Sequence, residues 1–393
     1  MTDAVLVVNS GSTSLKFKVY ATGQGTEPPL LCSGMIDEME TAPHFEAKDP
    51  DGKPLGSKDW GEGQVLTHKA GLTYLLQWLE QHEANIKVAA AGHRVVLGGE
   101  RFPKSVLVTP EVLDYLEGLA KMEPTHQAFN VRGVRALAED FPGLPQVTVF
   151  DTSFHRTMPD VAQIYPISKK ARDTGVRHWG YHGISYDYIS RQVPKVMPSA
   201  KRVIVAHLGG GASVCAIKDG QSMETSMQFG AITGLPMATR SGDMPADALF
   251  YLLKTGEFTP ETLEKDLSKN GGLLGLSGIS EDMKTLQESK DPAAKFAIEA
   301  FVYSLVKYIG AYTAVLGGLD ALVFTAGIGE HSSIVRAAVV EKLGFLGVTL
   351  DAAANDRNGP LISTPDSKVA VYVIPTDEEK MIAGHTLMLT NLA

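Results

Sequence analysis

The sequence predicts an α/β protein made of two duplicated halves. Short apolar runs rich in β-branched residues alternate with longer amphipathic stretches, a pattern typical of sheets covered by helices. A strand–turn–strand pattern at residues 5–20 recurs at residues 203–220. Both copies contain an apolar strand, a turn of small residues and a second strand. We therefore expect a duplicated fold with a cleft between its halves.

The expected elements follow one another along the whole chain. Strands are expected at VLVV (5–8), VTVF (147–150), RVIVAH (202–207), ALVFTAG (321–327) and VAVYVIP (369–375). Helices are expected at residues 67–82, 110–121, 293–317 and 376–390. No linker rich in proline and serine separates these elements, so the repeat locates the join. We expect an N-terminal domain at 1–150, with the C-terminal helix (about 380–393) packed back on it, and a C-terminal domain at 151–379.

Composition limits the class of protein. The 393 residues are 44% hydrophobic and 21% charged, as in a soluble protein with about two or three domains. A net charge of −9 argues against nucleic acid or an anionic membrane as a partner. Cys32 and Cys215 lie far apart, which suits a reducing compartment and offers no disulfide framework. The chain starts without a signal sequence, so we expect a cytoplasmic protein.

A turn of small residues follows the first expected strand. In NSGSTSLK, residues 9–16, short hydroxyls and backbone N–H groups can cradle phosphate oxygens without a bulky side chain in the way. HLGGGAS, residues 207–213, repeats this arrangement, and Lys16 adds a charge after the first turn. The P-loop pattern GxxxxGKS/T does not occur in the sequence. A hairpin turn with solvated lysines has the same pattern, so this turn alone decides nothing.

Charged side chains gather at further strand ends and turns. Arg94 in GHRVV, Asp151 in VFDTSFH, His182 in HWGYHGIS and Arg240 in ATRSGD each follow an apolar run or lie beside glycines. Either arginine can form a structural ion pair with Asp151 or Asp243. Ligands usually bind at strand ends in α/β folds, however, so we expect these groups to converge on an anionic substrate. Guanidinium, imidazole and carboxylate groups together suit phosphoryl transfer, in which positioning and charge neutralisation do most of the catalysis.

At this point the chain resembles a known family, the acetate and propionate kinases. The resemblance runs from Val5 to about His385, and NSGSTSLK, VFDTSFH, HLGGGAS, ATRSGD, FTAGIGE and IPTDEE carry it in order. It implies two ribonuclease H-like domains of the actin, Hsp70 and sugar kinase type, the second of which binds the nucleotide. It also implies a homodimer. The implied reaction is reversible transfer of the γ-phosphoryl group of ATP to acetate, directly and in line, giving acetyl phosphate and ADP, with Mg²⁺ (or Mn²⁺ in its place).

The resemblance also implies roles for individual residues. Catalysis is assigned to Asp151, His182, Arg240 and His126. The acid is assigned to Arg94, Val96, Thr125, Tyr181 and Ala231. ATP is assigned to Lys16, His207, Leu208, Gly209, Gly210, Gly211, Asp282, Met283, Lys284, Gly327, Ile328, Gly329, Glu330 and His331. The metal is assigned to Asn9 and Glu378; Thr376 and Glu379 fit a capping box, which leaves Glu378 free for this role.

The chain departs from the family pattern around both substrates. Gly210, Lys284 and His331 stand where the family usually has asparagine, arginine and asparagine, which predicts weaker discrimination among purine nucleotides. Around the acid, Tyr181 replaces phenylalanine and Ala231 replaces proline. These changes predict a pocket that tolerates propionate, or a slightly larger or hydroxylated acid, better than a typical acetate kinase does.

Three other functions are consistent with parts of the pattern. A kinase for propionate or another short-chain carboxylate would use the same residues. A non-catalytic ATP-binding clamp of the actin and Hsp70 type would keep the phosphate-binding turns, but it would have no need for Arg94 and Arg240. A sugar kinase would need a general base for a hydroxyl group, whereas a carboxylate is already a nucleophile.

Overall fold

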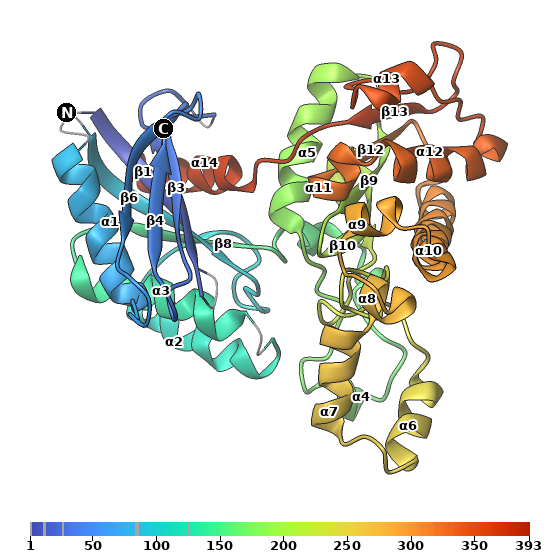
Figure 1. Ribbon diagram of the computed structural model, residues 1–393, viewed down its shortest axis with the longest axis horizontal. Coiled ribbons are helices and arrows are strands. Elements are labelled where there is room, and N and C mark those ends of the chain that lie inside the picture. Colours follow the sequence, from blue (N-terminus) through green and yellow to red (C-terminus); the bar gives the residue numbers. More distant parts are fainter. Residues whose placement is uncertain (1, 11–12, 26, 83–85, 124–125) are drawn as a thin grey trace. The chain divides into compact units, whose positions relative to one another are not determined.

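The chain forms two compact units in the computed structural model, which describes residues 2–10, 13–25, 27–82, 86–123 and 126–393 (Figure 1). Unit 1 consists of Met1–Ser153 and Asp377–Ala393, and unit 2 consists of Phe154–Thr376. Asp151 and Glu378 both belong to unit 1, whereas the boundaries expected from the sequence assign them to the second domain.

Unit 1 is built on a mixed sheet with the strand order β5-β4-β3-β2-β1-β6-β8-β7. Strands β1 to β5 pair antiparallel in sequence order, and β1, β6 and β8 run parallel. The strands are β1 (Thr2–Ser10), β2 (Leu15–Ala21), β3 (Leu30–Asp37), β4 (His44–Lys48), β5 (Pro54–Asp59), β6 (Ile86–Val95), β7 (Val106–Leu107) and β8 (Gln146–Phe150).

Helices cover both faces of this sheet. Helix α1 (His68–His82) and the end of α3 (Gln127–Asp140) pack on the face that carries Leu6, Val8 and Phe17. Helix α14 (Glu378–Thr390) packs on the other face, where Gly92 leaves room for it: a Cβ atom at this position would collide with Thr386. Figure 1 shows α14, in red, beside the blue strand β1, although the two lie at opposite ends of the chain. Helix α2 (Pro110–Gly118) completes the unit with a 3₁₀ turn at Leu119–Lys121.

Unit 2 repeats the central part of this sheet. Its strand order is β11-β10-β9-β12-β13, with β9 (Arg202–Leu208), β10 (Ala212–Lys218), β11 (Gln221–Thr225), β12 (Ala321–Thr325) and β13 (Ala370–Val373). The strands β11, β10 and β9 pair antiparallel, and β9, β12 and β13 run parallel. The strands β3-β2-β1-β6-β8 of unit 1 have the same order and directions. The predicted duplication is therefore confirmed.

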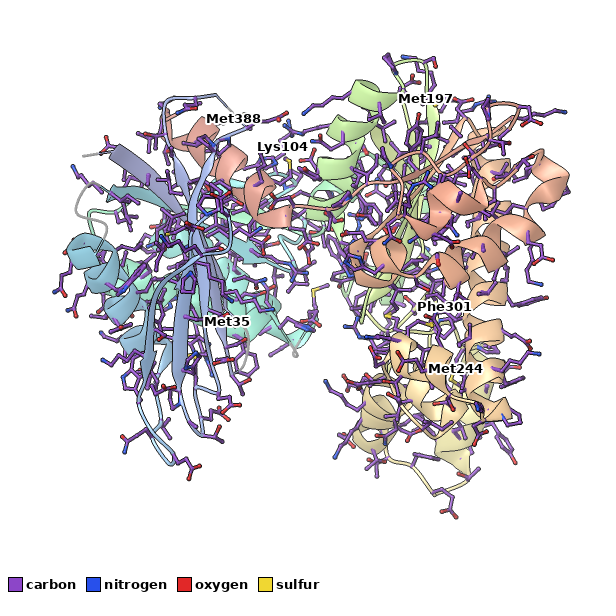
Figure 2. The ribbon with its side chains drawn as sticks, turned by 45° about the horizontal axis from the view of Figure 1, so that its top comes forward. Met35, Lys104, Met197, Met244, Phe301 and Met388 are labelled. Carbon is purple, nitrogen blue, oxygen red and sulfur yellow. The ribbon has the colours of Figure 1, made fainter. Side chains whose placement is uncertain are left out.

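The helices of unit 2 are α4 (Lys169–Arg172), α5 (Gly183–Val196), α6 (Ala246–Lys254), α7 (Pro260–Lys265), α8 (Gly272–Ser277), α9 (Met283–Glu288), α10 (Pro292–Leu316), α11 (Ala326–His331), α12 (Ser333–Lys342) and α13 (Ala352–Asp356). Among these helices, α5, α10 and α11 contact the sheet of unit 2, whereas α6 and α7 contact each other. Helix α5 packs on the face that carries Val203, Val205 and Cys215, because alternate strand residues share one face. Phe301 of α10, labelled in Figure 2, is completely buried.

Most of the expected helices are confirmed, with one correction at a helix start. Helix α10 starts at Pro292 behind its cap Asp291 and ends before Gly317, which has the positive φ of a C-terminal cap. The last helix starts at Glu378 rather than at residue 376, and the predicted capping box is wrong: the Asp377 side chain accepts from the Lys380 N–H at 3.1 Å. Within the described residues, no helix is both long and apolar enough to span a bilayer.

Candidate functional site

In unit 1, Arg94 and Asp151 form a two-point ion pair. Arg94 lies on β6 and Asp151 directly follows the neighbouring strand β8, so the two parallel strands bring both residues to the same edge of the sheet. Arg94 Nε donates to Asp151 Oδ1 at 3.1 Å, and Arg94 Nη2 donates to Asp151 Oδ2 at 2.6 Å. The Asp151 side chain is only 1% exposed. The guanidinium geometry therefore fixes the direction of a buried carboxylate.

Glu378, in the first turn of α14, lies on the other side of Arg94. Its Oε2 is 3.8 Å from Arg94 Nε. The pKa of Glu378 is raised to about 7, mainly by burial and further by the carboxylate of Asp151, while Arg94 opposes this rise. Two carboxyl groups thus lie around a single guanidinium. This surplus of oxygen donors fits a hard divalent cation, which is usually bound by one or two carboxylates together with phosphate oxygens and water.

The start of α14 is held to the sheet by a lysine that the sequence analysis did not assign. Lys18 Nζ lies 3.1 Å from Asp377 Oδ1 and 3.2 Å from Glu379 Oε2. Burial opposes the charge of Lys18, but Glu379 and Asp377 outweigh this effect and raise its pKa. Glu379 is therefore an ion-pair partner and not part of a capping box. Lys18 in effect positions the turn that carries Glu378.

Asn9 and Lys16 lie on the same sheet face as this cluster. They are paired across β1 and β2, and their neighbours Val8, Leu15 and Phe17 belong to the core on the opposite face. Asn9 and Lys16 therefore share the α14 face with Lys18. In the described part of the chain, no group of three or more histidine, cysteine or acidic side chains forms a metal cluster by itself. An amide oxygen from Asn9 suits the same cation as Glu378.

Three further assigned residues of unit 1, Val96, Thr125 and His126, lie between β6 and α3. Val96 is buried, and its N–H donates to Asn130 Oδ1 at 3.2 Å. Gln127 holds the next residue: its Oε1 accepts from the Leu97 N–H at 3.0 Å and its Nε2 donates to the Leu97 carbonyl at 3.0 Å. The His126 side chain is half exposed, with Nδ1 3.1 Å from Glu123 Oε1. Thr125 lies outside the described residues.

In unit 2, His182 and Arg240 meet over a glycine. His182 precedes α5 in a left-handed conformation, with φ of 58°. A Cβ atom on Gly211 would lie 3.2 Å from His182 Nε2 and 3.6 Å from Arg240 Nη2. Both nitrogens therefore face the glycine-rich turn after β9, and the lack of a side chain at Gly211 leaves space in front of them. Arg240 is oriented by its Nη1, which donates to the Ala231 carbonyl at 2.8 Å.

Tyr181 and Ala231, the two acid-site residues that depart from the usual family pattern, have different environments. The Tyr181 hydroxyl donates to the Phe229 carbonyl at 2.8 Å, and its side chain is 2% exposed. The extra hydroxyl is therefore satisfied by the backbone. Ala231 contributes its carbonyl to Arg240. The backbone of Tyr181 is also fixed, because Nε2 of the buried His155 lies 2.9 Å from the Tyr181 carbonyl oxygen.

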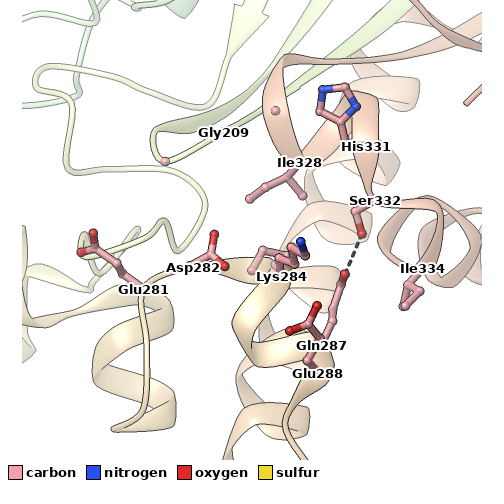
Figure 3. Close-up of a pocket in the computed structure, with 13 residues that line it drawn as sticks. Gly209, Glu281, Asp282, Lys284, Gln287, Glu288, Ile328, His331, Ser332 and Ile334 are labelled. Atoms are coloured by element: carbon pink, nitrogen blue, oxygen red, sulfur yellow. Dashed lines mark hydrogen bonds between the residues drawn. The ribbon is translucent and has the colours of Figure 1, made fainter.

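A pocket of about 580 Å³ opens beside the glycine turn (Figure 3). Eight of the residues predicted to bind ATP line it: Gly209, Gly210, Asp282, Met283, Lys284, Gly327, Ile328 and His331. The predicted ATP ligands His207, Leu208, Gly211, Gly329 and Glu330 lie in unit 2 but outside this lining, and Lys16 lies in unit 1. Glu330 braces the strand ends, because its Oε1 accepts from the Ala326 N–H at 2.8 Å and from the Thr376 N–H at 3.2 Å.

Comparisons with known proteins decide the family. A model of the acetokinase family matches residues 4–384. The chain belongs to the acetokinase family. The acetate kinase of Rhodopseudomonas palustris (strain ATCC BAA-98 / CGA009) is 44% identical over 397 residues, covering 100% of this chain and 99% of that protein.

Two solved structures agree with this membership of the acetokinase family. The acetate kinase of Porphyromonas gingivalis is 33% identical, with a TM-score of 0.89, covering 99% of this chain and 100% of that chain. A propionate kinase from Francisella tularensis subsp. tularensis SCHU S4 is 34% identical, with a TM-score of 0.90, covering 100% of both chains. The chain thus has the duplicated actin-like and Hsp70-like fold that the sequence predicts.

The pocket beside the glycine turn includes residues that the motifs did not indicate. Gln287 and Glu288 lie on the same face of α9 as Lys284, three and four positions along the helix, which is the signal that points to them. Gln287 Nε2 donates to Ser332 Oγ at 2.6 Å, the contact drawn in Figure 3. Glu281 also lines the pocket. The rim is therefore mixed in charge rather than uniformly basic.

Proposed function

We propose that this chain catalyses the reversible transfer of the γ-phosphoryl group of ATP to acetate, in line and without a phosphoenzyme, giving acetyl phosphate and ADP. One observation carries the proposal: a single glycine turn lines a large pocket and also faces two side chains that can bind phosphate. Gly209 and Gly210 line the pocket, and Gly211 faces His182 and Arg240. A nucleotide seated in the pocket would direct its phosphates along this turn.

Each side chain has a defined task in this reaction. His182 and Arg240 would donate N–H groups to the transferring phosphoryl oxygens, and the guanidinium of Arg240 would offset their charge. Arg94 would orient the acid through the N–H groups that it does not give to Asp151, and Asp151 would keep the guanidinium in place. His126 would act as an auxiliary donor. The acid needs no general base, because its carboxylate is already a nucleophile.

Mg²⁺ fits the carboxylates around Arg94, and Mn²⁺ can replace it. Asn9 and Glu378 would hold the metal ion, with Asp151 nearby. When bound, the ion would supply positive charge to the phosphate oxygens. In this proposal, unit 2 binds the nucleotide in its pocket, and unit 1 contributes the acid and metal residues Arg94, Asp151 and Glu378.

The enzyme is proposed to be a cytoplasmic homodimer. Large apolar side chains are exposed on unit 2, including Tyr251 (69%), Phe250 (60%) and Tyr303 (71%). Helix α6, all of whose residues the structure describes, contains no buried residue. Exposed aromatic groups on this scale support an interface. Light scattering tests the proposal, with twice the 42.1 kDa chain mass as the expected result.

Propionate is the second candidate acid. It is favoured by the full-length likeness to a propionate kinase and by Ala231, which lacks the ring of the usual proline. A hydroxylated acid gains less support, because the Tyr181 hydroxyl is already bonded to the backbone.

Trapping the acyl phosphate with hydroxylamine tests the function. ATP and Mg²⁺ are supplied with acetate, propionate, butyrate or glycolate, and the coloured hydroxamate is measured. We expect product with acetate and with propionate. The absence of a hydroxamate with every acid of this panel would refute the proposal and leave the ATP-binding clamp.

A further inference from the structure

Two stacked histidine rings lie beside the glycine turn, and each is bonded to a serine. The rings of His182 and His207 are stacked with centroids 4.1 Å apart and planes inclined by 25°. His182 Nδ1 lies 2.8 Å from Ser213 Oγ, and His207 Nδ1 lies 2.9 Å from Ser185 Oγ. Each serine also lies within hydrogen-bond distance of a second hydroxyl group. Ser185 Oγ is 2.8 Å from Thr376 Oγ1. Ser213 Oγ is 2.5 Å from the Tyr186 hydroxyl.

Burial determines the direction of the hydrogen bonds that link Tyr186, Ser213 and His182. Ser213 and Tyr186 are both 0% exposed. Among the described residues, the hydroxyl of Tyr186 has Ser213 as its hydrogen-bond partner, so its proton goes to Ser213 Oγ. The proton of Ser213 then has one acceptor within reach, Nδ1 of His182. The reverse arrangement would leave a buried hydroxyl proton without an acceptor, which costs about 1–3 kcal/mol.

Because His182 Nδ1 accepts the Ser213 proton, the proton of the neutral His182 ring lies on Nε2. We propose that Tyr186 and Ser213 are positioning residues that hold His182 as a neutral ring protonated at Nε2, so that this N–H points at the phosphoryl group. The inference rests on the proposed phosphoryl role of His182 and adds to it the residues that fix its proton.

The surroundings of His182 also oppose the doubly protonated ring. A charged imidazolium would turn Nδ1 into a donor and leave Ser213 to accept two protons while its own has no acceptor. Arg240 Nη2 and His182 Nε2 both lie beside Gly211, so a second positive charge there is unfavourable. On the stacked ring of His207, Nδ1 lies beside the Ser185 hydroxyl, which in turn lies beside the Thr376 hydroxyl. His182 therefore acts as a hydrogen-bond donor, while Arg240 supplies the charge.

Nitrogen NMR on histidine-labelled protein reads the tautomer directly. The chain has 11 histidines, and the signals lost in His182→Gln identify the ring in question. At pH 7.5 we expect the two-bond coupling pattern of a neutral ring protonated at Nε2. A ring protonated at Nδ1, or a charged ring, would overturn the proposal. The spectrum needs no activity, so it separates this inference from the acetate kinase function, which the hydroxamate assay tests on the wild type.

Kinetics of matched variants test the role of the Tyr186–Ser213–His182 relay, which is the pair of hydrogen bonds that joins these three side chains. Tyr186→Phe removes only the terminal hydroxyl, and we expect kcat to fall about tenfold while KM for ATP and acetate stays within about twofold. Ser213→Ala should lose more and mix the two tautomers in the spectrum, and Ser213→Thr should restore the Nε2 form. Tyr372→Phe is the control, because Tyr372 belongs to the same buried cluster as Tyr186. An unchanged kcat in Tyr186→Phe, or equal losses in both tyrosine variants, would refute the relay.

Discussion

The Arg94–Asp151 pair permits a double-mutant test of whether these residues hold each other. Removing one partner of a buried ion pair costs about 3–5 kcal/mol, because the other charge is left without compensation. Asp151 is 1% exposed, but the Arg94 side chain is 27% exposed, so solvent screens part of the interaction. We therefore expect Arg94→Met to lower the free energy of unfolding by about 2–3 kcal/mol.

The double variant separates the structural effect from the catalytic one. Arg94→Met with Asp151→Asn removes both charges, so its loss of stability should be smaller than the sum of the single losses by about 1–3 kcal/mol. Urea unfolding followed by circular dichroism measures these values at pH 7.5. Acyl phosphate formation should stay near zero in Asp151→Asn, because nothing then keeps the Arg94 guanidinium in place, and in the double variant, because it lacks that guanidinium.

Two outcomes would contradict this reasoning. A coupling energy near zero would mean that the pair behaves like a solvated surface pair, and Asp151 would then not be held by Arg94. Recovery of activity together with stability in the double variant would mean that both residues are structural only.

Three further predictions follow from the geometry. Arg240→Ala should lower kcat about a hundredfold or more with a smaller change in KM for acetate, because its charge acts mainly in the transition state; near wild-type turnover in the folded variant would refute the assignment. Lys284→Arg should raise the ratio of kcat/KM for ATP over GTP, since a planar guanidinium stacks better on a base, and a strong ATP preference in the wild type would contradict the premise. Burial lowers the pKa of His93 to about 4, so the unfolded chain binds a proton there first as the pH falls below about 6.5. Urea unfolding of wild type and His93→Gln at pH 7.5 and 5.5 should therefore show a loss in the wild type larger by about 1.4 kcal/mol, and parallel losses would refute this.

The sequence predicted the repeated fold because the repeat is local. Each strand–turn–strand unit is complete within about twenty residues, and the same pairing follows in both units. The start and end of α10 were also predictable, since Asp291 and Pro292 are typical of a helix start and Gly317 is typical of a helix end. Local chemistry was sufficient in these cases.

The helix start at residue 378 was not predictable from local chemistry. Thr376 and Glu379 fit a capping pattern, but distant residues engage both side chains. The Thr376 hydroxyl bonds Ser185, and Glu379 pairs with Lys18. Asp377 caps the helix instead, although its carboxylate also pairs with Lys18. Tertiary contacts thus override a plausible local pattern.

The candidate site was predictable in its residue types but not in its pairing. Arg94 and Arg240 each had two possible acidic partners in the sequence. The parallel strands β6 and β8 select Asp151 for Arg94, whereas Arg240 donates to a backbone carbonyl. Asp243 instead accepts from the Tyr308 hydroxyl and from the Gly234 N–H. Such choices depend on strand register, which single residues do not reveal.

Phosphorus NMR of one reaction mixture tests the central claim most directly. The purified protein is incubated with ATP, Mg²⁺ and acetate, and the phosphorus signals are followed as ATP is consumed. The account predicts that acetyl phosphate and ADP appear in equal amounts, and that neither appears without acetate. Formation of ADP with inorganic phosphate at the same rate in the presence and absence of acetate would contradict it.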